Sequence, residues 1–416
     1  MRIGLVVPDL RDPGGIPAEA RLVARSLRRE LGADVRIVSM ATSSSDGSSR
    51  LLRRPRTWLR HPIGSYVHEE FTVEHVGATG ADIELARYRQ RRELLERVAS
   101  CDVLHVLSGT PAFANAVRSF RGPLVVHFAS FARHERLDPI QPSASLIGSW
   151  RRLMTRGVTA LERSALRRAD LIIAMNDTRR REAEAIAGGA VPVTTVHTGV
   201  DTERFSPGPF PGDGYLLAVG RLSDPRKNIP LLLRAYAAAR QQSSAVPRLV
   251  LAGYRPPSAE SWQLVAELGI GDYVEYRGAV EAAQLNDLYR GAASFVLSSD
   301  EEGLGIVILE AMACGLPIVA TSCIGPTETV TDNSEGLLVP VGSVSDLSNA
   351  ILRISADEPL RRRLSRAARA RAVREFSLEP AAARLGAAYR DHGIVPTAPV
   401  AAASPRHPAG HPARVT

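Results

Sequence analysis

The sequence is poor in cysteine, aromatic residues and lysine. Of its 416 residues only 3 are cysteines, and Phe, Trp and Tyr together make up 5%. Cys101, Cys314 and Cys323 form no C-x-x-C pair, so the sequence offers neither a disulfide framework nor a zinc site. No basic tract is interleaved with aromatic residues, which argues against base stacking, and we expect no nucleic-acid partner.

Long apolar runs are also missing. No window holds 18 uninterrupted apolar residues, which excludes an ordinary transmembrane helix. Residues 3–7 form a strand-like run that ends at Pro8 and Asp9, too short and wrongly flanked for a signal peptide. We therefore expect a cytoplasmic protein.

The positive charge comes almost entirely from arginine. The formal net charge is +8, and Lys227 is the only lysine among 52 basic residues. A general replacement of lysine by arginine is typical of biased genomic composition rather than of a binding adaptation. Even so, the arginine-rich segments 50–60, which contain Trp58, and 151–168 are suited to docking on anionic lipid. Peripheral contact with the inner face of a membrane is therefore a hypothesis.

Short runs rich in Val, Ile and Leu recur at intervals of roughly 20 to 40 residues, with amphipathic stretches between many of them. Most runs are apolar on both faces, as in parallel strands that are covered by helices on both sides. This alternation predicts doubly wound α/β sheets, and two sets of about six units predict two Rossmann-like domains. The expected strands are 3–7, 35–40, 103–107, 124–128, 171–175 and 193–196, then 215–219, 249–253, 273–277, 295–298, 317–320 and 337–339.

The Gly- and Pro-rich segment 198–214 is the predicted boundary between a first domain, residues 1–197, and a second, residues 198–376. Residues 41–80 are long for a connection and predict a loop, either functional or simply mobile. The Pro-, Ala- and His-rich tail, residues 394–416, has no periodicity and is expected to be disordered.

Ligands bind open parallel sheets beyond the carboxyl ends of the strands. After the first strand, Gly14 and Gly15 precede a helix, and paired glycines let a backbone approach an anion closely. Glycines that merely form a tight turn are an equal alternative. In the second domain, Arg221 and Lys227 follow strand 215–219 beside a helix start, which suits a diphosphate better than a solvated basic loop.

The most specific segment is residues 298–317. It runs from a strand through an acidic glycine-containing loop into an apolar helix that Glu310 interrupts. A buried carboxylate is costly unless it is paired, so we expect Glu310 to face the inter-domain cleft and accept hydrogen bonds from a ribose. A Glu310–Arg ion pair with only a packing role is the alternative. Glu302 is placed to contact a sugar hydroxyl, and the helix start attracts an anion through the segment Gly303, Leu304, Gly305 and Ile306.

His127 lies near the end of strand 124–128, where it could reach a substrate in the cleft. A lone histidine in an apolar strand is more often a satisfied core residue, and His105 has a similar setting.

Together these segments resemble glycosyltransferase family 4, a family of retaining enzymes with the GT-B fold, in which two Rossmann-like domains face each other across a cleft. The resemblance extends to about residue 393. Residues 220–228 resemble the family's phosphate-binding segment, and Glu302 and Glu310 resemble its two glutamates, which are separated by seven residues. Residues 198–201 resemble the inter-domain hinge, although Thr198 stands where the family usually has Asn.

The resemblance implies a role for each matching residue. Arg221 and Lys227 would hold the leaving diphosphate, Glu310 the ribose hydroxyls, and Glu302 the transferred sugar. It also implies a nucleotide-diphosphate sugar as donor, a glycan, a lipid-linked molecule or a small molecule as acceptor, retention at the anomeric carbon, no metal or other cofactor, and a C-terminal helix, residues 377–393, that returns to the first domain. Gly15 would let the backbone approach the phosphate, and His127 would contact the donor sugar.

Three other functions fit similar architectures. A phosphorylase would need a lysine for pyridoxal phosphate, and Lys227 lies in a loop suited to phosphate instead. A nucleotide-sugar 2-epimerase would lack the Arg221–Lys227 pair combined with the two glutamates. A non-catalytic nucleotide-sugar-binding protein stays open as an alternative.

Overall fold

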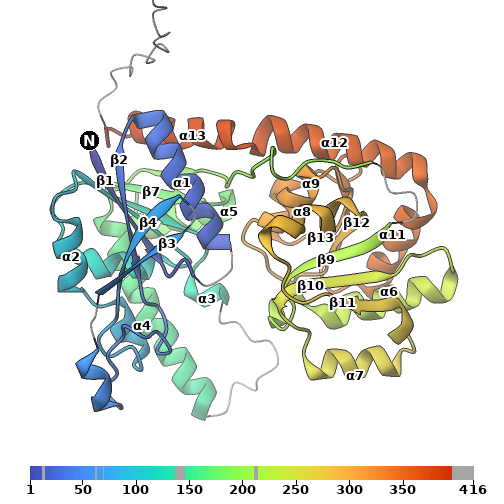
Figure 1. The fold of residues 1–416 in the computed structure, drawn as a ribbon, viewed down its shortest axis with the longest axis horizontal. Helices are drawn as coiled ribbons and strands as arrows, with labels where there is room; N and C mark the ends of the chain where they lie inside the picture. The colour runs from blue at the N-terminus through green and yellow to red at the C-terminus, as the bar shows by residue number, and fades with distance from the viewer. Residues whose placement is uncertain (12–14, 61–62, 69, 136–145, 210–213, 396–416) are drawn as a thin grey trace, which may run out of the picture.

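The computed structural model describes residues 1–416 except 12–14, 61–62, 69, 136–145, 210–213 and 396–416. Two sheets lie side by side, each in its own α/β unit (Figure 1). The first sheet has eight strands in the order β3-β4-β2-β1-β5-β6-β7-β8, and the second has six in the order β11-β10-β9-β12-β13-β14. This is the predicted pair of doubly wound domains. The predicted disordered tail falls on 394–416, of which all but the first two residues lie outside the described part of the chain.

The first unit contains residues up to the end of β8. Its strands are β1 (Arg2–Pro8), β2 (Asp34–Met40), β3 (Ile63–His68), β4 (Phe71–Val76), β5 (Val103–Ser108), β6 (Leu124–Phe128), β7 (Leu171–Ala174) and β8 (Val193–Thr195). Its helices are α1 (Gly15–Leu31), α2 (Arg92–Val98), α3 (Ala132–Glu135), α4 (Leu146–Arg168) and α5 (Asp177–Ala187), with 3-10 turns η1 (Pro55–Leu59), η2 (Glu84–Tyr88) and η3 (Pro111–Val117).

The second unit follows the connection after β8. Its strands are β9 (Tyr215–Arg221), β10 (Leu249–Arg255), β11 (Val274–Tyr276), β12 (Ala292–Leu297), β13 (Ile318–Thr321) and β14 (Gly336–Val339). The helices of this part of the chain are α6 (Ile229–Gln242), α7 (Ala259–Glu267), α8 (Ala282–Arg290), α9 (Ile306–Ala313), α10 (Ile324–Thr329), α11 (Val344–Ala356), α12 (Glu358–Phe376) and α13 (Leu378–Asp391), with turns η4 (Pro225–Lys227) and η5 (Gly271–Tyr273).

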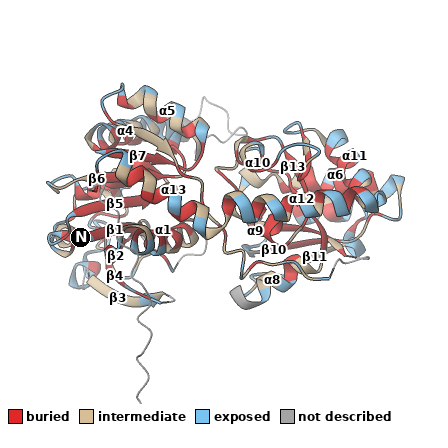
Figure 2. Ribbon diagram, turned by 90° about the horizontal axis from the view of Figure 1, so that it is seen from above, coloured by how far each residue is buried: buried red, intermediate tan, exposed pale blue. Residues whose placement is uncertain are grey.

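Each central strand is buried on both faces, because helices cover both sides of its sheet. Every residue of β5, β6 and β12 is buried. In the first unit, one face packs against α2, α4 and α5, and the other against α1 and α13. The layers of buried residues are visible in Figure 2. Among the described residues, none of the helices is both long and apolar enough to cross a membrane.

The prediction of a long loop over residues 41–80 is wrong. This stretch contains η1 and the hairpin of β3 and β4, which extends the first sheet: β4 pairs in parallel with β2, and β3 pairs antiparallel to β4. The buried residues Phe71 and Val73 alternate with the exposed Thr72 and the partly buried Glu74, as a strand with one covered face requires. That alternation was the available signal, but the Ser- and Arg-rich flanks obscured it.

The C-terminal helices bridge the two units. Figure 1 shows α12 and α13 lying end to end across the top of both. α12 packs on α9 of the second unit, whereas α13 packs on α1 of the first, as predicted for a helix that returns. The chain crosses between the two units once after β8 and once between α12 and α13. These two crossings are hydrogen-bonded to each other, since Val200 N donates to Phe376 O at 2.7 Å. The two crossings therefore form one connected hinge.

A chain of polar side chains runs beneath α13. Tyr389 on α13 is fully buried, and its hydroxyl lies 2.7 Å from Nδ1 of His105 on β5. The other ring nitrogen of His105 lies 3.2 Å from Nδ1 of His127 on β6. Burial lowers the pKa of both histidines, that of His127 to about 3, so both rings are neutral at physiological pH.

We predict that Tyr389→Phe destabilises the protein by about 1–3 kcal/mol, because it leaves Nδ1 of the buried His105 without its partner. Thermal or urea unfolding would measure this loss. Tyr254→Phe is the matched control, since Tyr254 is 39% exposed. Equal stability of the two variants would contradict a structural role for the polar chain.

Candidate functional site

Arg221 and Lys227 lie at the carboxyl end of β9, as predicted. The strand ends at Arg221, and the turn η4 carries the chain to Lys227 and then to Asn228, which has φ +43° and caps α6 through its side chain. A Cβ built on Gly220 would lie 3.6 Å from Cε of Lys227, so the lysine stem runs beside the strand end. Arg221 is 44% exposed, with Nη2 3.2 Å from the Asp224 carboxylate.

Lys227 forms an ion pair with Glu302. Their side chains are only 15% and 17% exposed, so most of the water around both charges has been removed. Two further hydrogen bonds hold the Lys227 turn against the acidic loop: Ser298 Oγ donates to Lys227 O at 2.8 Å, and Asp300 N donates to Arg226 O at 2.8 Å. The two predicted motifs of the second domain therefore form a single site.

The helix α9 begins where the acidic loop ends. Gly305 caps it with φ +81°, a left-handed conformation that favours glycine. A Cβ on Gly305 would lie 2.9 Å from Ile308 Cδ1 and 3.2 Å from Glu302 Cγ, so the turn packs closely against both side chains. The positive end of the α9 dipole therefore lies beside the Lys227–Glu302 pair.

Glu310 lies one turn further along α9. Its carboxylate accepts a hydrogen bond of 2.7 Å from the hydroxyl of Tyr289, a contact that the sequence did not indicate, in place of the arginine ion pair considered as an alternative. Burial raises the pKa of Glu310 to about 7, partly offset by that hydrogen bond and by the charges of Arg204 and Arg21. Arg21 belongs to α1, so a charge of the first domain contributes to the pKa of Glu310.

The first domain meets this site at two points. A Cβ on Gly15, at the start of α1, would lie 3.1 Å from Ile306 Cδ1 at the start of α9. A Cβ on Gly303 would lie 3.7 Å from Ala129 O, just beyond β6. The predicted glycine loop and the predicted acidic loop therefore face each other across the domain boundary, although Gly14 lies outside the described residues.

Three contacts across the boundary were not found from the sequence. Asn176 Nδ2 donates to Gly303 O at 2.7 Å, and the buried guanidinium of Arg179 lies 2.8 Å from Glu301. Glu328 of α10 accepts from Asp177 N at 3.0 Å at the first turn of α5. The sequence does indicate Asn176 as a helix cap. The residues near Asn176 in the sequence, however, give no sign of the partners, which lie more than 100 positions away.

The expectation that His127 faces the cleft is not met in this structure. Its ring has no exposed surface and points to the face of the sheet that α13 covers. Within the described part of the chain its Nε2 has no hydrogen-bond partner. The ring therefore lies in the core, where Nδ1 contacts His105, and it differs from a fully satisfied core histidine.

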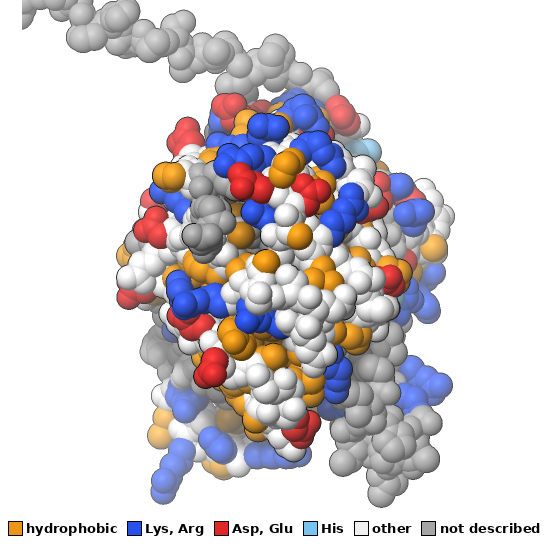
Figure 3. All heavy atoms as spheres, turned by 90° about the vertical axis from the view of Figure 1, so that its right-hand side faces the viewer, with side chains coloured by type: hydrophobic (Ala, Val, Ile, Leu, Met, Phe, Trp, Pro, Cys, Tyr) orange, Lys and Arg blue, Asp and Glu red, His pale blue; other side chains and the backbone are white. Residues whose placement is uncertain are grey.

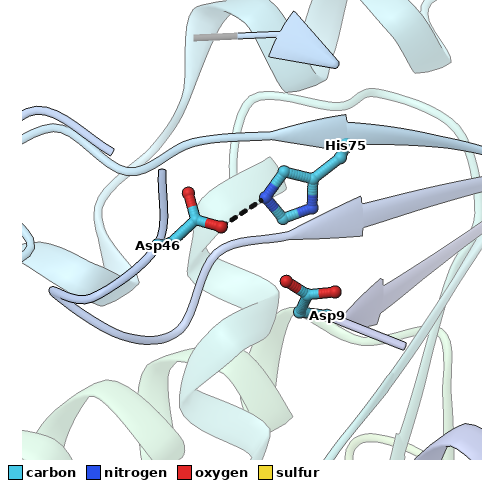
Figure 4. Close-up of side chains that lie close together, drawn as sticks. All are labelled: Asp9, Asp46 and His75. Atoms are coloured by element: carbon cyan, nitrogen blue, oxygen red, sulfur yellow. Dashed lines mark hydrogen bonds and ion pairs between the residues drawn. The ribbon is translucent and has the colours of Figure 1, made fainter. Parts of the chain in front are cut away.

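A second polar cluster occupies the carboxyl ends of β1, β2 and β4 in the first domain. Figure 4 shows Asp46 and His75 hydrogen-bonded, with Asp9 beside them. Their ligand atoms lie within 4.8 Å of one another, an arrangement that could hold a metal ion. Nη2 of Arg11 already lies 2.6 Å from Asp9 and 3.2 Å from Asp46, so a guanidinium fills the position of a cation.

Comparison with known proteins agrees with this geometry. The family model "Glycosyltransferase Family 4" matches residues 11–204, and "Glycosyl transferases group 1" matches residues 199–371. A D-inositol 3-phosphate glycosyltransferase of Kribbella flavida is 30% identical over 92% of both chains. The chain belongs to glycosyltransferase family 4. It is therefore a glycosyltransferase, and the resemblance of its sequence motifs to that family is confirmed.

Solved structures of other glycosyltransferases have the same fold as this family 4 glycosyltransferase, the GT-B fold. Sucrose-phosphate synthase from Thermosynechococcus elongatus superposes with a TM-score of 0.72 at 22% identity, covering 94% of this chain and 99% of that one. Anabaena Alr3699/HepE, solved in complex with UDP, gives a TM-score of 0.66 at 19% identity, covering 92% and 98%. The predicted two-domain GT-B architecture is confirmed.

We predict that Gly305→Ala destabilises this glycosyltransferase by about 2–4 kcal/mol, because the methyl group adds a clash with Ile308 to the cost of a left-handed alanine. Gly269→Ala is the matched control: it has φ +64° and no atom within 4 Å of the added carbon. Chemical denaturation of both variants separates the two costs. Equal losses would show that the turn at α9 is not tightly packed.

Proposed function

We propose that this protein is a retaining glycosyltransferase that moves a sugar from a nucleotide-diphosphate sugar to an acceptor hydroxyl without a metal ion. The proposal rests on one observation above all: the only lysine of the chain forms a largely buried ion pair with Glu302 at the start of α9. A cation, a carboxylate and a helix dipole occupy one place at the domain boundary.

The donor diphosphate would replace the Glu302 contact of Lys227. The ammonium group then binds phosphate oxygens, and the exposed Arg221 side chain turns from Asp224 to the same phosphates. Both cations and the first amides of α9 stabilise the negative charge that grows as the sugar leaves. A single preorganised donor of this kind contributes about 2.7–4 kcal/mol to a transition state.

The nucleoside would be held by Glu310. An ionised carboxylate can accept both hydroxyl hydrogens of a ribose, whereas a protonated one loses part of that capacity. Tyr289 keeps the Glu310 side chain in position from behind. UDP in the Anabaena relative makes a uridine nucleotide the first donor to test.

Glu302 would contact the transferred sugar once Lys227 is released to the phosphates. Retention would then come from attack by the acceptor on the face that the diphosphate leaves, with the leaving phosphate accepting the proton.

The acceptor would bind the first domain, at the strand ends that carry Asp9, Asp46, His75 and Arg11. Two carboxylates and a guanidinium close together offer several hydrogen-bond acceptors and donors, which suits a molecule with many hydroxyl groups. Since relatives at about 30% identity are named D-inositol 3-phosphate glycosyltransferases, a polyol or glycan acceptor, free or lipid-linked, is the class we propose.

We predict that Lys227→Met weakens donor binding about ten- to a hundredfold, the cost of a lost charged hydrogen bond. Isothermal titration with UDP, GDP, ADP and their sugars measures it. Arg226→Met is the matched control, because it removes the same charge from the same turn, where Asp224 binds the Arg226 guanidinium at 2.7 Å. Equal affinity of wild type and Lys227→Met would refute the diphosphate role.

Sugar release from the bound donor, with and without acceptors and in EDTA, tests the reaction itself. Turnover that persists in EDTA supports the metal-independent mechanism, and turnover that EDTA abolishes contradicts it. Donor binding without any hydrolysis or transfer would favour the non-catalytic sugar-nucleotide-binding alternative.

We predict that affinity for a nucleotide sugar rises between pH 6 and pH 8. The free carboxyl of Glu310 has a pKa of about 7, and ribose binding favours the charged form, so binding releases a proton below that pH. Glu310→Gln should remove this slope. Glu19→Gln is the control, since Glu19 is also buried with a pKa of about 7 but binds Thr198 at the hinge. A slope that survives Glu310→Gln would contradict the ribose contact.

A further inference from the structure

One face of α4 is buried near the middle of the helix and exposed to solvent toward its N-terminus. Gly157 and Val158 lie against the body of the domain: a Cβ on Gly157 would lie 3.2 Å from Leu85 of η2, and Val158 is fully buried. Trp150 and Leu153 precede Gly157 by seven and four residues and so share its face. They are 62% and 54% exposed. The apolar stripe thus continues for two turns beyond the part that the protein covers.

A second apolar group is exposed at η1. Leu52, Trp58 and Leu59 are 50%, 48% and 93% exposed. The turn that presents them is well fixed, since the indole Nε1 of Trp58 donates to Leu51 O at 3.0 Å and Thr57 Oγ1 donates to Arg54 O at 2.7 Å. These side chains are therefore held outward by an ordered structure.

The two groups belong to one end of the first domain. Asp82 accepts from Leu52 N and Arg53 N at 3.0 and 2.9 Å, and two residues later η2 begins and reaches α4 through Leu85. Figure 1 shows the blue segment that contains η1 and the free end of α4 together at the bottom of the first domain. We call the five exposed side chains the lower apolar surface: Leu52, Trp58, Leu59, Trp150 and Leu153.

The two segments that carry the lower apolar surface are basic, and the neighbouring carboxylate of Asp82 accepts hydrogen bonds from the backbone of Leu52 and Arg53. Segments 50–60 and 149–157 contain no Asp or Glu. By contrast, Figure 3 shows acidic and basic side chains interspersed over the face of the second domain. The basic side chains of the two segments are Arg50, Arg53, Arg54, Arg56, Arg60, Arg151, Arg152 and Arg156.

We propose that the lower apolar surface docks on a bilayer of anionic lipid. Tryptophans prefer the level of the headgroups, and an anionic leaflet attracts the arginines that lie near it. A second copy of the chain would bring two arginine-rich surfaces together, which like-charge repulsion opposes. The surface lies on the first domain and does not depend on the donor chemistry proposed above.

The three tryptophans of the chain provide the test, because two of them lie in the lower apolar surface and Trp262 lies on α7 of the second domain. The Trp262→Phe protein is titrated with vesicles of phosphatidylcholine, with and without phosphatidylglycerol. We expect a blue shift of its emission and co-sedimentation only with the anionic vesicles, both weakened by salt.

The double variant Trp150→Ser/Leu153→Ser should bind anionic vesicles at least about tenfold more weakly. The matched control is Val373→Ser, which changes a side chain that is 41% exposed on α12. Unfolding curves confirm that each variant folds, and donor titration is a separate readout that should not change. Donor binding that fails while vesicle binding persists would count only against the proposed function.

Three results would overturn the proposal. The first is equal binding to neutral and anionic vesicles, and the second is wild-type binding by the double variant. The third is no vesicle binding by the wild type; if analytical ultracentrifugation then shows a dimer that the double variant abolishes, the surface belongs to a second copy of the chain.

Discussion

The ion pair between Lys227 and Glu302 is the interaction on which the rest of the site depends. Two opposite charges at the end of a parallel sheet, each more than four-fifths covered, are stable only as partners. Their pairing fixes the turn after β9 against the loop after β12, and the tight turn at Gly305 then places the start of α9 beside them. In the proposed function, the cation that binds the donor phosphate is therefore already in place before the donor arrives.

The second constraint is that the site is completed by the other domain. The chain crosses between the domains twice, and the hydrogen bond from Val200 to Phe376 joins the two crossings. Asn176, Arg179 and the first amides of α5 hold the acidic loop and α10 from the opposite side. The domain boundary is thus held by polar contacts in which Asn176 and Arg179 are buried. The two domains also approach closely at Gly15 and Ile306.

The arginines of this chain serve different purposes by location. Some are buried and bonded to carbonyl oxygens or carboxylates, as Arg179 is, and others surround the exposed tryptophans of η1 and α4 at the far end of the first domain. A guanidinium is planar and weakly hydrated, so it tolerates both settings. The single ammonium group occurs where a compact charge fits between a strand end and a helix start.

The sequence by itself determined twelve of the strands, the hinge region and the motifs that carry Arg221, Lys227, Glu302 and Glu310, because hydrophobic periodicity and turn residues are local properties. Only the tertiary structure decided their partners. Lys227 binds Glu302 from 75 residues away, Glu310 binds Tyr289 rather than an arginine, and the ring of His127 lies in the core beneath α13. Pairing across such separations depends on how whole sheets and helices pack, and a side chain at a strand end can face either side of its sheet. The hairpin of β3 and β4 was missed for the same reason. Whether a short run becomes a strand at the side of a sheet depends on the strand with which it pairs, and that pairing is not a local property of the sequence.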